Sequence, residues 1–142
     1  MDILFLCNDD RADSLVGTLL LAVEGRKAGK DVGVMFSAAA LVALRSESFL
    51  WPRRFWPQDI RWSLADQAAA AGLPVTGRGQ ARAMDVMGIL GHASQQGIRL
   101  LACPVWSELL TPGYSPPVEL REVTVNEALE LIDSSKRVIG GF

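Results

Sequence analysis

Two cysteines are the strongest nucleophiles in this 142-residue chain. Cys103 ends the apolar run 98–103 and is followed directly by Pro104, a residue type that is favoured at the first position of a helix. We therefore expect Cys103 to be the last residue of a strand and the N-cap of a helix. The unpaired N–H groups at a helix start stabilise a thiolate, which is the form of cysteine that attacks sulfur or carries it as a persulfide.

The cysteines also allow other interpretations. A free cysteine at a strand end is often a small buried hydrophobe, so a purely structural Cys103 stays an alternative. Cys7 ends the apolar run 2–7. If its strand were the neighbour of the Cys103 strand, about 4.8 Å away, the two thiols could form a disulfide, or Cys7 could resolve a persulfide or a sulfenic acid.

The elements that must position these thiols alternate along the chain. Apolar runs predict strands at 2–7, 32–36, 98–103, 118–123 and 137–142, and helical spacing of apolar residues lies between most of them. This order predicts an α/β fold, a three-layer α/β/α sandwich with right-handed crossovers, in a single domain over 1–142. Local signals predict a capping box at Ser63 and Asp66, another at Thr124 and Glu127, and a helix with Ala83 on its inner face.

Parallel sheets bind ligands beyond the carboxyl ends of their strands. The candidate site therefore combines the thiols with the polar residues and helix-start amides that follow the strands: Cys7, Asn8, Asp9, Ser37, Cys103, Val105 and Trp106.

Residues 46–62 interrupt the pattern and predict an insertion or lid. The segment is rich in aromatic residues and contains Arg53, Arg54 and Arg61. It has three interpretations: a cap that binds an anion in the pocket through Arg53 or Arg54, a surface that stacks on single-stranded nucleic acid, or a subunit interface. Packing as a lid or interface is favoured, because the whole chain has a formal net charge of -2 and offers no basic field to nucleic acid.

Several classes of function are not expected. The chain has no Cys-x-x-Cys motif and its only histidine is His92, a predicted surface residue, so we expect no metal and no cofactor. Gly77-Arg-Gly79 is too short for a phosphate-binding loop. We expect no targeting segment and no membrane span, and a cytoplasmic location with reduced thiols.

The stretch Gly97-Ile-Arg-Leu-Leu-Ala-Cys103 resembles the signature of the DsrE-like (DsrE/DsrF/DsrH) family of small sulfur-handling proteins, in which an apolar strand ends in Ala-Cys or a close variant. The strand at 2–7, the strand at 32–36 and the closing helix with its final strand are similar too. The resemblance covers most of the chain except 46–62, and Pro104 also departs from the family pattern.

This resemblance implies a five-stranded parallel sheet and homo-oligomers, often trimers or hexamers. It implies that Cys103 receives sulfane sulfur and passes it to a partner protein, with the amides of Val105 and Trp106 stabilising the sulfur. It also implies that the strand at 32–36 separates the two thiols by roughly 10 Å, which favours Cys7 as a packed residue or a pocket wall. The alternative is a non-catalytic, oligomeric protein that binds a small anionic ligand or a partner.

Overall fold

Five parallel strands form the main sheet of the structure, a computed structural model that describes residues 1–110 and 119–141. Their order across the sheet is β6-β5-β2-β1-β7, with bounds β1 Ile3–Cys7, β2 Val32–Phe36, β5 Arg99–Ala102, β6 Arg121–Glu122 and β7 Arg137–Gly140. Every pairing within this sheet is parallel, and β2 lies between β1 and β5. The predicted five-stranded parallel sheet is therefore confirmed.

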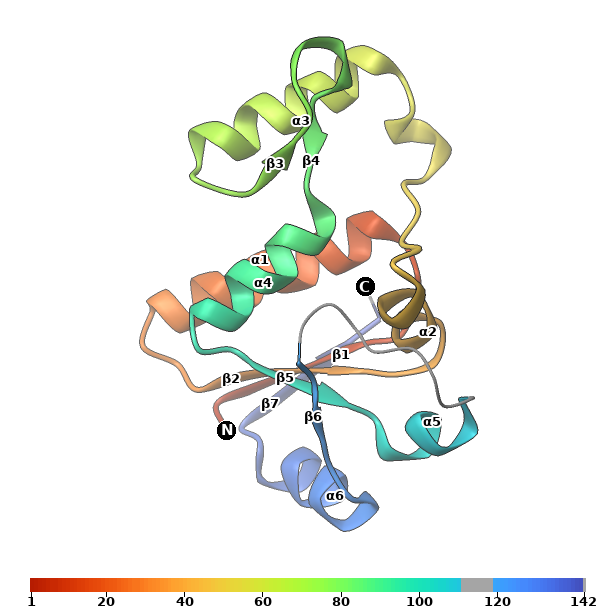
Figure 1. The fold of residues 1–142 in the computed structure, drawn as a ribbon. Helices are drawn as coiled ribbons and strands as arrows, with labels where there is room; N and C mark the ends of the chain where they lie inside the picture. The colour runs from red at the N-terminus through yellow and green to blue at the C-terminus, as the bar shows by residue number, and fades with distance from the viewer. Residues whose placement is uncertain (111–118, 142) are drawn as a thin grey trace.

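Helices cover both faces of this sheet, which confirms the predicted three-layer sandwich (Figure 1). Helices α1 (Ala12–Lys27) and α4 (Val86–Gln95) pack on one face, and α6 (Val125–Ser134) packs on the other. All five residues of β2 are buried, whereas β7 is mostly exposed, because a central strand is covered on both faces and an edge strand is not.

Two short helices lie near the carboxyl ends of the strands. Helix α2 (Ala38–Ser46) follows β2, and α5 (Pro104–Leu109) follows β5. The two helices contact each other, and α5 also contacts α6. Because each begins two residues after its strand ends, their first turns lie at the sheet edge where the candidate site is expected.

A small lobe is inserted between α2 and α4 and stands beyond the α1–α4 layer in Figure 1. It consists of η1 (Arg53–Phe55), α3 (Gln58–Ala70), η2 (Gly79–Ala81) and an antiparallel hairpin of β3 (Val75–Thr76) and β4 (Ala83–Met84). The Trp62 indole donates to the Gln80 carbonyl at 3.1 Å, and Arg82 pairs with Asp66 while stacking on Trp62. The predicted insertion thus continues past residue 62, to the start of α4.

Two of the predicted local signals are wrong. Ser63 and Asp66 lie inside α3 and form no cap, because that helix already begins after Pro57, and Asp66 accepts from Arg82 instead. Ala83 belongs to β4 and not to a helix. Helix α4 begins later, where the Asp85 carboxylate accepts from the Gly88 N–H at 2.8 Å.

The second capping box is confirmed at the start of α6. The Glu127 N–H donates to the Thr124 hydroxyl at 3.2 Å, and the Thr124 N–H donates to the Glu127 carboxylate at 2.7 Å. The strand predicted at 118–123 is present only as Arg121–Glu122, and its first residue, like the predicted loop 111–117, lies outside the described residues.

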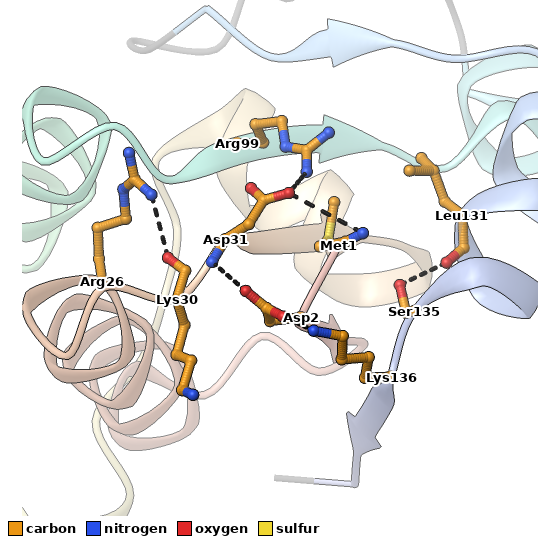
Figure 2. A network of polar contacts seen from close by, with 9 residues as sticks. All are labelled: Met1, Asp2, Arg26, Lys30, Asp31, Arg99, Leu131, Ser135 and Lys136. Carbon is orange, nitrogen blue, oxygen red and sulfur yellow. Dashed lines mark hydrogen bonds and ion pairs between the residues drawn. The ribbon is translucent and has the colours of Figure 1, made fainter.

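Charged groups join the amino ends of the strands (Figure 2). The Asp31 carboxylate pairs with Arg99 and lies 3.9 Å from the amino terminus of Met1. Asp2 accepts from the Asp31 N–H at 2.8 Å and from the Lys136 ammonium at 2.7 Å. These contacts connect β1, β2, β5 and β7, so we assign this edge a structural role.

We expect Asp2 to make stability depend on pH in the acid range. The backbone N–H of Asp31, and then Lys136, lower the pKa of Asp2 from its ordinary 3.8 to about 2. Because the folded-state pKa is the lower one, the stabilisation is complete above the unfolded-state pKa and is lost as the pH falls towards 2. In urea titrations, the free energy of unfolding should therefore fall more steeply below pH 4 for the wild type than for Asp2→Asn. Parallel curves for the two chains would contradict this.

Candidate functional site

The carboxyl ends of β1, β2 and β5 meet at one edge of the sheet. Backbone bonds continue the pairing past the strands. The Ser37 N–H donates to the Cys7 carbonyl at 3.0 Å, and the Cys103 N–H donates to the Phe36 carbonyl at 2.9 Å. The first residues after three strands are therefore held side by side, at the edge where parallel sheets bind ligands.

Cys103 joins the end of β5 to the first turn of α5 and is half-buried. Its side chain packs against the cluster on the α6 face of the sheet, which includes Met35, Leu101 and Val123. Among the described residues it forms no disulfide, and no hydrogen bond to its sulfur occurs there. The residue is therefore not fully buried, and its thiol has no partner among the described residues.

The first turn of α5, which follows Cys103 directly, contains polar groups without partners among the described residues. Pro104 takes the first helical position, as expected, and has no N–H. Among the described residues, no acceptor binds the backbone N–H groups of Val105 and Trp106. Ser107 follows Cys103 by one helical turn, and its hydroxyl is buried with no partner in the described part of the chain. No sequence motif singles out Ser107, although its i, i+4 spacing from a helix N-cap places both residues on one side of the turn.

Cys7 has the opposite environment. It is only 2% exposed and packs with the core on the α1–α4 face. Burial, and secondarily the negative charge of Asp9, raise the pKa of its thiol from 9.0 to about 12, although a hydrogen bond from Thr18 acts in the other direction. Cys7 is thus a protonated core residue near neutral pH.

The strand register keeps the two thiols apart. Cys7 pairs with Phe36, and Phe36 pairs with Ala102, so these three residues lie on the same face of the sheet. Cys103 comes one residue later and therefore lies on the other face. Because β2 also separates their strands, the geometry does not support a disulfide or a resolving role for Cys7.

The polar candidates at this edge mostly bind each other. The Ser37 hydroxyl donates to the Asn8 side-chain carbonyl at 2.5 Å, and both belong to the loops that follow β2 and β1. Asp9 accepts from the Arg11 N–H at 3.0 Å and from the Ser14 hydroxyl at 3.1 Å, so it stabilises the start of α1. Asn8 is exposed, whereas Ser37 and Asp9 are half-buried.

Ala38 adds an unusual backbone conformation at the same edge. It begins α2 directly after Ser37 with a φ of 48°, in the left-handed region that costs a non-glycine residue about 1–2 kcal/mol. Such strain concentrates at functional sites. No signal in the sequence indicates it, because the segment is a run of three alanines.

Arg53 and Arg54 belong to a different cavity. It has a volume of about 830 Å³ and is lined by the start of α1 and by the segment before α3, namely by Arg11, Asp13, Leu50, Trp51, Pro52, Arg53, Arg54 and Phe55. Cys103 does not line it. Cys103, Ser37, Val105 and Trp106 therefore lie at the carboxyl edge of the sheet. Arg53 and Arg54 instead line the separate cavity beside the start of α1.

The remaining expectations concern metal and membrane. His92 is half-buried on α4 rather than on the open surface. Within residues 1–110 and 119–141, no group of three or more His, Cys, Asp or Glu side chains is arranged to hold a metal ion. In the same described ranges, no helix has both the length and the apolar character needed to cross a bilayer.

Comparison with known proteins gives no further guidance to this site. No protein-family model matches the chain, and no curated protein is significantly similar to it.

Proposed function

We propose that the chain is a DsrE-like sulfur carrier or sulfurtransferase subunit that accepts and donates persulfide sulfur at Cys103. The observation that carries this proposal is the contrast between the thiols: Cys103 is half-exposed at the carboxyl edge of the sheet, and Cys7 is sealed in the core. The sequence resemblance around 97–103 supports it independently.

The transfer of the outer sulfur atom between two thiols needs no added oxidant. The Cys103 thiolate attacks the outer sulfur of a persulfide on a donor protein, the donor S–S bond breaks, and the donor thiolate leaves and takes up a proton. Cys103 then carries the outer sulfur as Cys–S–SH. The thiolate of an acceptor protein attacks that outer sulfur in turn, which restores the Cys103 thiolate.

The first turn of α5 supports this chemistry. The free N–H groups of Val105 and Trp106 can stabilise negative charge on sulfur, because they belong to the unpaired donors of a helix start. The buried, unpartnered hydroxyl of Ser107 is a further donor one turn away from Cys103. The proposal places the protein in the cytoplasm, where thiols stay reduced, with sulfur donor and acceptor proteins as its partners.

Mass spectrometry tests this proposal. After incubation with a low-molecular-weight persulfide donor, the wild-type chain should gain one sulfur atom, and Cys103→Ala should gain none. Cys7→Ala is the matched control and should still be loaded, because Cys7 takes no part. Equal loading of Cys103→Ala and the wild type, or no loading of the wild type, would reject the sulfur-carrier function.

A second candidate function rests on the separate cavity of about 830 Å³. Arg54 lines it with no partner among the described residues, and Trp51 and Phe55 form an aromatic wall with ring centroids 5.2 Å apart. Arg11 is already paired with Asp13. Guanidinium groups beside aromatic rings suit a small anion that has a planar apolar part.

Quenching of tryptophan fluorescence by a nucleoside monophosphate tests this binding function. We expect saturable quenching for the wild type and at least about tenfold weaker binding for Arg54→Ala, since a charge-assisted hydrogen bond contributes about 1.5 kcal/mol or more. Arg78→Ala removes an exposed arginine outside this cavity and serves as the control. Identical titrations for wild type and Arg54→Ala would argue against a specific anion site.

A further inference from the structure

The segment before α3 also lines an apolar groove of about 630 Å³, which adjoins the arginine-lined cavity and shares four lining residues with it. We call it the arm groove; its lining residues are Phe49, Leu50, Trp51, Pro52, Arg53, Trp56 and Arg61. Two of its apolar side chains are largely uncovered, with Leu50 exposed to 69% and Trp56 to 61%. Arg53 and Arg61 are exposed at the groove and pair with no carboxylate among the described residues.

Helix α6 carries an uncovered apolar stripe. Val125, Leu129 and Ile132 recur at i, i+4 and i+7, which places them on one side of the helix. Leu129 is 55% exposed, and the inward side of α6 is formed by Ala128 and Leu131 instead. The stripe is therefore exposed apolar surface that does not take part in packing α6 onto its own sheet.

A row of acidic groups borders that stripe. Glu130 and Asp133 each follow a stripe residue by one position, about 100° further round the helix. Both are exposed, and neither has a partner among the described residues. Helix α6 thus presents an apolar row beside a negative row.

The two surfaces are complementary in charge, and one is a groove whereas the other is a ridge of side chains along a helix. One is an apolar groove bordered by two arginines that pair with no carboxylate among the described residues, although Arg53 lies 5.7 Å from the centroid of the Trp56 ring. The other is an apolar helix stripe bordered by two carboxylates that have no partner within the same part of the chain. Laying such a stripe into such a groove is a recurrent mode of recognition, read as anchors at i, i+4 and i+7. Both surfaces belong to this chain, so a second copy of the chain is the occupant that satisfies both.

The two surfaces cannot meet within one copy. The arm groove lies on the segment that leads into the lobe, where Phe49 and Trp51 pack against the core of the α1–α4 face. Helix α6 covers the opposite face of the sheet (Figure 1). We propose that the arm groove of one copy receives α6 of the next copy, head to tail. Contacts between two different surfaces form closed rings when the rotation closes, so this contact predicts a ring of copies.

Sedimentation velocity at micromolar concentration tests the contact by charge reversal. The wild type should sediment as an oligomer, and two variants should sediment as monomers: Arg53→Glu with Arg61→Glu in the groove, and Glu130→Arg with Asp133→Arg on α6. Each places like charges opposite each other, so we expect association to weaken by about a hundredfold or more. Arg78→Glu is the control and should leave the oligomer intact, because Arg78 is exposed outside the groove.

The decisive variant combines all four charge-reversal substitutions, which restores opposite charges across the contact. It should regain the oligomer, and far-UV circular dichroism confirms that every variant is folded. A wild type that sediments as a monomer, a groove or α6 variant that stays fully assembled, or a folded four-substitution chain that stays monomeric would overturn the proposal. Sulfur loading of Cys103 is measured separately on the same chains, so failure of this contact and failure of the carrier function are distinguishable.

Discussion

Treatment of the folded chain with an alkylating reagent at pH 8 is expected to modify Cys103 and to leave Cys7 unmodified. Only the thiolate reacts, and a thiol with a pKa of about 12 is ionised in roughly one molecule in ten thousand at pH 8, on the order of a thousandfold less than an ordinary cysteine. Burial of the Cys7 side chain slows its reaction further, whereas Cys103 is half-exposed. Peptide mass spectrometry over time measures both rates.

Three controls define this result. Cys103→Ser should remove the fast-reacting thiol, and denaturant should make Cys7 react at the ordinary rate. Any slow reaction of Cys7 in the folded chain should rise about tenfold per pH unit, because its thiolate fraction does so below the pKa. Comparable rates for both cysteines in the folded state would show that Cys7 is not sealed in the core.

Phe36→Ala should have the largest effect on stability among single substitutions at the site. The Phe36 side chain is 0% exposed, at the end of the central strand β2, and belongs to the core on the α1–α4 face. Removing a buried phenyl group leaves a cavity and costs about 3–5 kcal/mol of unfolding free energy. Urea denaturation monitored by circular dichroism measures the loss.

Val42→Ala is the matched control for this substitution. Val42 lies on α2 and is 45% exposed, so we expect a change within about 0.5 kcal/mol, as is usual for surface positions. The Phe36 carbonyl also accepts from the Cys103 N–H, so cavity relaxation should disturb the position of Cys103. A cost for Phe36→Ala as small as that for Val42→Ala would contradict the central place of β2.

The sequence alone determined the layered fold and the position of Cys103 in it. Near-continuous apolar runs predict buried parallel strands, and helical spacing between them predicts the covering layers. Cys103 before Pro104 predicted a strand end that is also a helix N-cap; the structure confirms the N-cap and ends the strand one residue earlier, at Ala102. Thr124 and Glu127 predicted the start of α6 correctly. These features depend on residues close together in the chain, so local patterns suffice.

The inserted lobe depends on contacts that a local pattern does not contain. Asp66 suggested a helix cap, but its partner is Arg82, sixteen residues later in the chain. Ala83 fits a helical pattern locally and joins a strand because Val75–Thr76 pairs with it. In both cases a residue distant in sequence decided which of two local structures formed.

The face of the sheet on which each thiol lies was decided by the tertiary structure alone. Alternation along one strand is visible in a sequence, but the relative face of residues on different strands depends on the hydrogen-bonded register. Cys7, Phe36 and Ala102 are in register, so Cys103 is turned to the other face. Likewise, α6 has five apolar residues in its ten, and only packing against a five-stranded sheet decides which of them are covered. The spacing of residues along the chain determines whether a segment is a helix or a strand. Strand register and packing determine which side chains come into contact.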